Sequence, residues 1–253
     1  MDRRVLKSAV FFILSLGGTI FGHAYAGGAP GTGIAGSAHD FSGKPAGGAV
    51  TGLCTFCHTP HRAIVTPQLQ NHTLSLLTFR WCDRTKTSNG TPLPTIPPTH
   101  PGPSRICLGC HSGTVTAGDI NWFNGRSWTG AATLDNKITW RRCATPQGCI
   151  SHPHNNHPVA LPYPYQGAVS TYNGVTNNAA VLGKFVPDPT VNGIRLFREE
   201  AGRIVIGPAA GRTGIECSSC HDPHNGRTVQ GPSFLRGTRM TLCQKCHVGN
   251  IWW

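Results

Sequence analysis

The apolar and polar positions of the chain form only two regular patterns. An apolar stretch of about 13 residues covers positions 9–21. Residues 194–206 alternate apolar and polar side chains around Ala201 and Gly202, which predicts a β-hairpin. Residues 92–103 are rich in proline, which fixes the backbone and removes hydrogen-bond donors, so we expect an extended spacer there. The rest of the pattern predicts irregular structure.

The N-terminal apolar stretch has the flanks of a secretory signal. Three basic residues precede it and two small residues follow it: Arg3, Arg4, Lys7, Ala24 and Ala26. We expect residues 1–26 to be a cleaved signal peptide, because the stretch is shorter than the roughly 20 residues of a membrane span. A retained anchor is the alternative. The mature chain is then expected to be soluble and secreted, at the cell surface or outside the cell, with the periplasm as the alternative location.

Composition favours a loop-rich protein with a thin apolar core. The chain has 32 glycines and 20 prolines among 253 residues, and 38% of its residues are hydrophobic. It carries 22 Lys or Arg against 10 Asp or Glu, a formal charge of +12. The basic residues are scattered rather than clustered, so we expect no nucleic-acid partner. No other apolar run has the length of a membrane span.

The sequence Cys-x-x-Cys-His occurs four times. The motifs are Cys54, Cys57 and His58; Cys107, Cys110 and His111; Cys217, Cys220 and His221; and Cys243, Cys246 and His247. This is the attachment pattern of c-type haem. The two thiols form thioethers with the two vinyl groups of one porphyrin, and the adjacent His binds the iron. Zinc sites or a disulfide framework do not explain why His follows every time. We therefore expect four haem c groups.

Four macrocycles change the expected fold, because flat porphyrins can replace an apolar core. We expect a mostly irregular multihaem cytochrome c fold with short helices around the motifs, a small β-hairpin and haems as the core. The chain is predicted to be one tetrahaem domain, 27–253. Two haem-bearing arms, 27–111 and 208–253, flank an insertion at 112–207.

The second axial ligands are expected to be histidines. Apart from the initiator, Met240 is the only methionine, so Met/His ligation serves at most one haem. Eight further histidines follow the signal peptide: His39, His61, His72, His100, His152, His154, His157 and His224. His61 and His224 stand in a repeated context, each as the last residue of Cys-x-x-Cys-His-x-Pro-His. We expect each to turn away from its own haem and towards a neighbouring one. A structural or surface role is the stronger expectation for His72, His100, His152 and His154.

These motifs carry a family resemblance. The doubled pattern is accompanied by Ser37-Ala38-His39-Asp40-Phe41, Asn155-Asn156-His157-Pro158-Val159 and Phe234-Leu235-Arg236. Together they resemble the extracellular multihaem cytochromes of metal-reducing bacteria, in particular OmcE-type tetrahaem subunits that polymerise into cytochrome filaments. The resemblance implies four distal ligands: His39, His61, His157 and His224. It also implies that His61 ligates a haem of the adjacent subunit, whereas a compact periplasmic cytochrome could use it within one chain.

Three cysteines lie outside the motifs: Cys82, Cys143 and Cys149. We expect a disulfide between Cys143 and Cys149, which close a short loop, and a free Cys82. A bond from Cys82 to either of the other two is the alternative, as is a bridge from Cys82 to another molecule. A zinc site of Cys143, Cys149, His152 and His154 is a further alternative.

The predicted function is electron transfer through four bis-His haems, with the chain as the repeating subunit of an extracellular filament. The expected partners are further copies of the chain, redox partner cytochromes and extracellular electron acceptors. A monomeric periplasmic shuttle is the second hypothesis. A multihaem reductase is the third, and the sequence disfavours it because histidines suffice to close all four irons. We therefore expect no enzymatic activity.

Overall fold

We describe a computed structural model of the chain. The described residues are 29–42, 45–46, 49–50, 52–61, 63, 69–112, 115, 120–123, 126–128, 148–150, 157–229 and 234–249. The expected signal peptide, residues 1–26, lies outside the described residues, as do Cys143, His152 and His154. Within the described ranges, none of the helices combines the length and the hydropathy needed to cross a bilayer.

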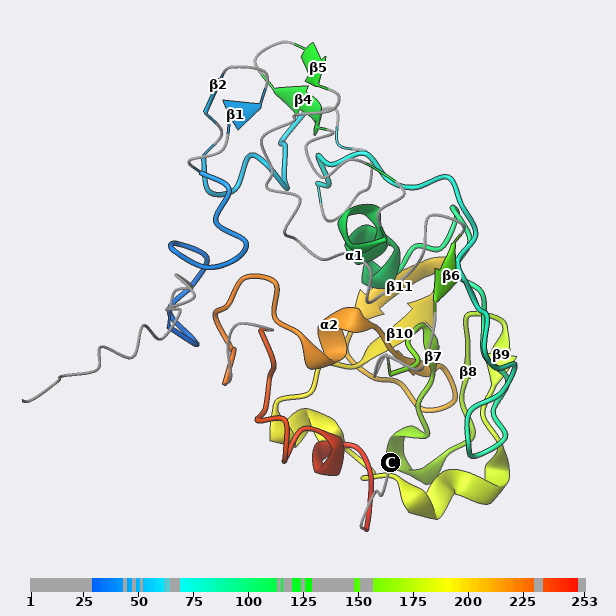
Figure 1. The fold of residues 1–253 in the computed structure, drawn as a ribbon. Coiled ribbons are helices and arrows are strands. Elements are labelled where there is room, and N and C mark those ends of the chain that lie inside the picture. The colour runs from blue at the N-terminus through cyan, green and yellow to red at the C-terminus, as the bar shows by residue number, and fades with distance from the viewer. Residues whose placement is uncertain are drawn as a thin grey trace, which may run out of the picture.

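Helices are few and short (Figure 1). The α-helices are α1, Pro103–His111, and α2, Cys217–Cys220. The 3-10 helices are η2, Tyr165–Gly167; η3, Ala179–Lys184; η4, Pro189–Asn192; and η5, Cys243–Lys245. The second, third and fourth motifs lie at α1, α2 and η5, as expected, whereas the first motif, residues 54–58, forms turns and no helix. With nine residues, α1 is longer than a single turn.

The strands are short and numerous. They are β1, Pro45–Ala46; β2, Ala49–Val50; β3, Arg80–Trp81; β4, Ile120–Phe123; β5, Arg126–Trp128; β6, Cys149–Ile150; β7, Leu161–Pro162; β8, Thr171–Tyr172; β9, Val175–Thr176; β10, Phe197–Glu200; β11, Arg203–Ile206; and β12, Thr213–Ile215. Four of them form an antiparallel sheet of order β11-β10-β12-β7. The others pair in twos: β1 with β2, β4 with β5, β8 with β9, and β3 with β6, of which only the last pair is parallel.

The predicted hairpin is confirmed. β10 pairs antiparallel with β11, and Phe197 faces Ile206 while Glu200 faces Arg203. Ala201 and Gly202 connect the strands with φ of 49° and 72°. Two central residues with positive φ give the turn whose twist matches that of the strands. β10 also pairs with β12, which leads directly into α2 and the third motif.

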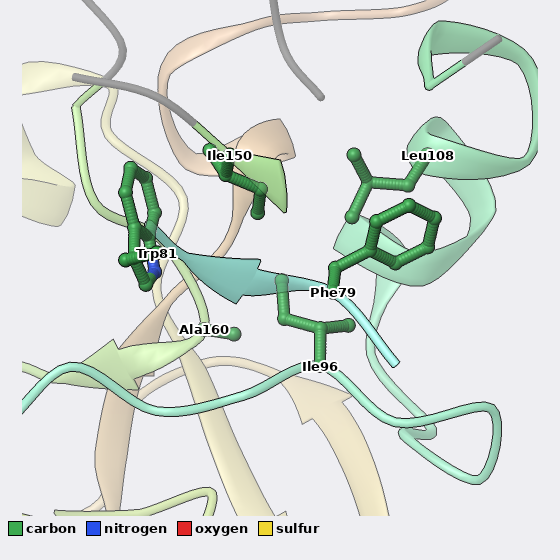
Figure 2. Packing of buried hydrophobic residues seen from close by; sticks show 6 residues of the cluster. All are labelled: Phe79, Trp81, Ile96, Leu108, Ile150 and Ala160. Carbon is green, nitrogen blue, oxygen red and sulfur yellow. The ribbon is translucent and has the colours of Figure 1, made fainter. Parts of the chain in front are cut away.

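A cluster of six buried apolar residues connects α1 to the neighbouring strands (Figure 2). Its members are Phe79, Trp81, Ile96, Leu108, Ile150 and Ala160. The N–H of Phe79 donates to the carbonyl of Ile96 at 3.0 Å, and the reverse bond is 2.9 Å long. These two hydrogen bonds hold the proline-rich spacer beside the cluster. It contains no helix until α1 begins at Pro103, where a missing N–H costs no hydrogen bond.

The disulfide differs from the one that we expected. Cys82 is bonded to Cys149, 67 positions away, so the predicted bond between Cys143 and Cys149 is wrong and the alternative is correct. The zinc-site alternative is excluded in the same way, because the sulfur of Cys149 is already used. The reason is a long-range contact: β3 and β6 lie in parallel register, and the N–H of Cys82 donates to the carbonyl of Ile150 at 3.2 Å.

A second apolar cluster holds the C-terminal motif against the sheet. It consists of Leu161, Tyr163, Ile194, Leu196 and Ile215, and Leu242 and Cys246 pack against it. The hydroxyl of Tyr163 donates to the carbonyl oxygens of Val186 and Cys246, at 2.5 and 3.2 Å. The described residues therefore form several small apolar clusters within short helices, small sheets and mostly irregular structure. A core made of haems stays a prediction.

Candidate haem sites

The four Cys-x-x-Cys-His motifs share a tight turn. In three of them the N–H of the histidine donates to the carbonyl of the first cysteine: His58 to Cys54 at 2.8 Å, His221 to Cys217 at 3.1 Å and His247 to Cys243 at 2.9 Å. The remaining motif lies in α1, which ends at His111. This turn places both cysteines and the histidine of one motif next to each other, as one porphyrin requires.

The structure brings three of the four motif histidines close to a predicted distal ligand. The ring centres of His39 and His111 are 6.1 Å apart, and those of His58 and His224 are 6.0 Å apart. The ring centres of His157 and His247 are 6.1 Å apart. Each pair joins residues that are far apart in the sequence. His224 faces the first motif rather than its own, which is the orientation that we expected for it.

These distances fit an iron held between two imidazoles. A bond from a metal to an imidazole nitrogen is about 2 Å long, and the ring centre lies about 1 Å further away, so two rings on opposite sides of one iron have centres about 6 Å apart. Other ring pairs of the described residues range from 4.3 Å, for Phe41 and Phe56, to 6.3 Å, for His39 and Phe41, so the spacing agrees with an iron between the rings but is not unique to it. The three histidine pairs therefore have the spacing of bis-His haem iron.

Burial favours the neutral form of four of these imidazoles, and metal binding requires a neutral imidazole. Burial lowers the pKa of His111 to about 4, and the nearby His39 adds to the effect. Burial, assisted by His157, likewise lowers the pKa of His247 to about 4. The pKa values of His39 and His224 are also below 6.5, again because of burial first. At neutral pH these four rings therefore have a nitrogen lone pair available for iron.

Backbone carbonyls fix which nitrogen is available. Nδ1 of His39 lies 2.9 Å from the carbonyl oxygen of Pro223, and Nδ1 of His157 lies 2.7 Å from that of Pro158. A carbonyl only accepts, so Nδ1 carries the hydrogen and Nε2 holds the lone pair. The ring orientation of these two predicted distal ligands is set in this way by the protein itself.

The eight motif cysteines are thiols and form no disulfide. Burial raises the pKa of Cys57 to about 11, and it raises the pKa values of Cys220 and Cys246 to about 12. A side-chain hydrogen bond with Cys107, followed by burial, raises the pKa of Cys217 well above its usual range. The first cysteines of the second and third motifs therefore lie side by side, which places two attachment points next to each other.

The other predicted ligands have different surroundings. His61 is exposed, and its backbone carbonyl accepts a hydrogen bond from Oγ1 of Thr59 at 2.7 Å. Met240 is 85% exposed. His72 and His100 are buried and bonded to protein groups, with Nδ1 of His72 2.7 Å from the carbonyl of Thr73. Their structural role is the one that we expected. Within the described residues, no three or more His, Cys, Asp or Glu side chains gather into a further metal site.

A buried carboxylate between the second and third motifs was missed by the sequence analysis. Glu216 is fully buried and accepts hydrogen bonds from the N–H of Ser104 at 3.0 Å and the hydroxyl of Tyr172 at 2.7 Å. Nε2 of His100 lies 3.1 Å from the same carboxylate. Oγ of Ser104 in turn accepts from the N–H of Cys217 at 2.9 Å. This Glu216 network ties α1 to α2. A glutamate directly before a motif was the only available signal.

The comparison with known families agrees with the motif chemistry. Residues 208–250 match the doubled CXXCH motif family. The match contains the third and fourth motifs and lies inside the second predicted arm. These motifs bind haem c covalently. The match supports a multihaem c-type cytochrome whose haems transfer electrons. No curated protein and no solved structure matches the chain.

Proposed function

We propose that the chain carries four haem c groups with two axial histidines each and passes electrons between them. The observation that carries the proposal is the spacing of 6.0 to 6.1 Å in three histidine pairs. Haem supplies a one-electron iron couple, and the protein supplies attachment, ligands and spacing. The adjacent Cys107 and Cys217 favour a short separation between the second and third haems.

The haem number has a direct test. Mass spectrometry of the purified holoprotein is expected to give the mass of the chain after residue 26 plus four haems. Electron paramagnetic resonance of the ferric protein with its subunits assembled is expected to show low-spin iron only, because both axial positions are then filled. Fewer haems, or a high-spin signal in the resting protein, would contradict the proposal and reopen the case for a reductase.

We further propose that the chain is secreted and polymerises, with His61 donating a ligand to a haem of the adjacent subunit. Two observations support this. His61 has the same sequence context as His224, whose ring faces the motif histidine His58, and the side chain of His61 is exposed. Such a filament would extend the haem chain from redox partner cytochromes in the cell envelope to external electron acceptors.

The variant His61→Ala tests polymerisation. It is expected to keep all four haems and to abolish filaments, as seen by electron microscopy of material sheared from expressing cells. Met240→Ala, which also truncates an exposed side chain, is the control and should leave filaments normal. Normal filaments from His61→Ala would refute the role of His61 between subunits. Monodisperse particles from the wild type would favour the periplasmic shuttle instead.

A further inference from the structure

A buried arginine beside the third motif has an unused donor. The side chain of Arg236 is only 2% exposed. Its Nε donates to the carbonyl of Ser218 at 3.1 Å, and its backbone N–H donates to that of Cys220 at 2.9 Å. Its Nη2 is buried, and in the described part of the chain it makes no hydrogen bond. A buried cationic donor without an acceptor is costly, so this atom indicates a missing anion.

The protein's own carboxylate does not complete the site. Oδ1 of Asp222 lies 3.5 Å from Nη2 of Arg236, within ion-pair range but outside hydrogen-bonding geometry. Its two oxygens already accept from the N–H groups of His224 and Arg227, at 3.3 and 2.6 Å. Burial is the main cause of the lowered pKa of Arg236, and the nearby charges of Arg195 and Arg227 add to it.

We name these four residues, Arg195, Asp222, Arg227 and Arg236, the arginine cluster. It has three cations and one carboxylate, so it attracts a further anion. The charges of Arg195 and Arg236 act on His224, as does the facing His58. The arginine cluster therefore lies beside the histidine pair that belongs to the first motif, although it is built from the C-terminal half of the chain.

A haem at this pair brings the missing anion. Such a haem would be attached through its vinyl groups to Cys54 and Cys57, and it would carry two propionates that need cationic partners. The arginine cluster would supply such partners from a different segment of the chain. A guanidinium is also the side chain best suited to bind a carboxylate with two hydrogen bonds.

We propose that Arg236, assisted by Arg195, binds a propionate of the haem held between His58 and His224. This inference rests on the proposed haems. The contact joins the C-terminal arm to a haem attached to the N-terminal arm. It also offsets a negative charge near that iron, which favours the ferrous state and raises the reduction potential of this haem relative to a site without the arginine.

The test is a potentiometric titration of the holoprotein, followed by visible absorption, with haem counting by mass spectrometry. In Arg236→Gln, one of the four midpoints is expected to fall, so that the ratio of ferrous to ferric haem at a fixed potential changes about tenfold, or about 59 mV. Arg236→Lys keeps the charge and should shift less. Arg198→Gln is the control, because Arg198 pairs with Glu200 at the surface of the hairpin.

A second variant guards against misfolding. If Arg236→Gln does not yield folded holoprotein, Arg195→Gln at a half-buried position is expected to lower the same midpoint by a smaller factor. If every folded variant of Arg236 and Arg195 keeps four haems and shows unchanged midpoints, the propionate assignment is wrong. The proposed function is not affected by that result. A wild-type count below four haems would instead refute the proposed function.

Discussion

Residues 54–61 and 217–224 have the same sequence pattern but different surroundings. Both contain two cysteines, a proximal histidine, a proline and a final histidine. The ring of His224 lies 6.0 Å from His58, a partner 166 positions away in the same chain. His61 is exposed, and among the described residues no aromatic or imidazole ring lies against it. One local pattern therefore has two outcomes, decided by the segments that pack around it.

The two segments are also held by different means. The second is preceded by the buried Glu216 and contains Asp222, whose carboxylate accepts from the N–H groups of His224 and Arg227. The first is held by Asn71, which donates from its side chain to the carbonyl of Thr55 at 2.7 Å and from its backbone to that of Cys57 at 2.8 Å. A charged network thus fixes the second segment, whereas neutral hydrogen bonds fix the first.

The largest loss of stability is expected when the disulfide is removed. The disulfide between Cys82 and Cys149 closes a loop of 67 residues that includes α1. Replacing both cysteines by Ala should lower the free energy of unfolding by about 4 kcal/mol, because the unfolded chain regains entropy. Urea unfolding of the double variant against the wild type measures this loss. An unchanged midpoint would show that the bond does not constrain the unfolded chain.

Disrupting the Glu216 network, which holds the second segment, should lower the free energy of unfolding nearly as much. Glu216→Gln removes a buried charge with three donors and is expected to lower the free energy of unfolding by about 3 kcal/mol. Its matched control is Glu200→Gln, since Glu200 is exposed and its surface ion pair with Arg198 contributes about 0.5 kcal/mol. Urea unfolding of both variants measures the two losses in free energy of unfolding. Equal losses would mean that the Glu216 network adds nothing beyond a surface pair.

The first segment should be less sensitive. Asn71 is fully buried, and Asn71→Ala leaves the carbonyl of Thr55 without its side-chain donor. The expected loss is about 2 kcal/mol, less than for Glu216 because no charge is involved. The same unfolding assay applies. A loss larger than that of Glu216→Gln would reverse our ranking of the two segments.

Alkaline pH should destabilise the Glu216 network, which includes Tyr172. Burial, followed by the charge of Glu216, raises the pKa of Tyr172 far above its usual 10.0. The folded state then holds this proton more tightly than the unfolded state, so the stabilisation is complete below pH ~10 and is lost as the pH rises further. The slope is at most about 1.4 kcal/mol per pH unit. Tyr172→Phe should reduce this slope when unfolding is compared below and above pH ~10, and an unchanged slope would contradict the assignment.

The sequence predicted what local spacing determines. The four attachment motifs, the hairpin at residues 194–206 and the extended spacer at 92–103 follow from patterns within a few positions of each other. The structure agrees with the hairpin, and with the spacer except at its last residue, where α1 begins. The helix that contains the second motif was expected to be short. It has nine residues because it begins at Pro103, and Leu108 packs into the cluster of six buried apolar residues that contains Phe79.

The sequence could not predict contacts between distant segments. Loop length favoured the bond between Cys143 and Cys149, but the parallel pairing of β3 with β6 brings Cys82 to Cys149 instead. No sequence motif marks Glu216 or Arg236. Glu216 accepts a hydrogen bond from Ser104, more than 100 positions away, and the proposed role of Arg236 depends on an expected haem. Which distal histidine faces which motif also depends on the fold, since His39 meets His111 and His157 meets His247.

The contrast between His224 and His61 is tested most directly by electron paramagnetic resonance of ferric, fully dissociated subunits. We predict that His224→Ala converts one low-spin haem to high spin, because the first motif loses its second ligand within the chain. His61→Ala should leave the spectrum of dissociated subunits identical to that of the wild type. A low-spin spectrum for His224→Ala, or a new high-spin signal only for His61→Ala, would contradict the assignment of His224 to the haem of His58.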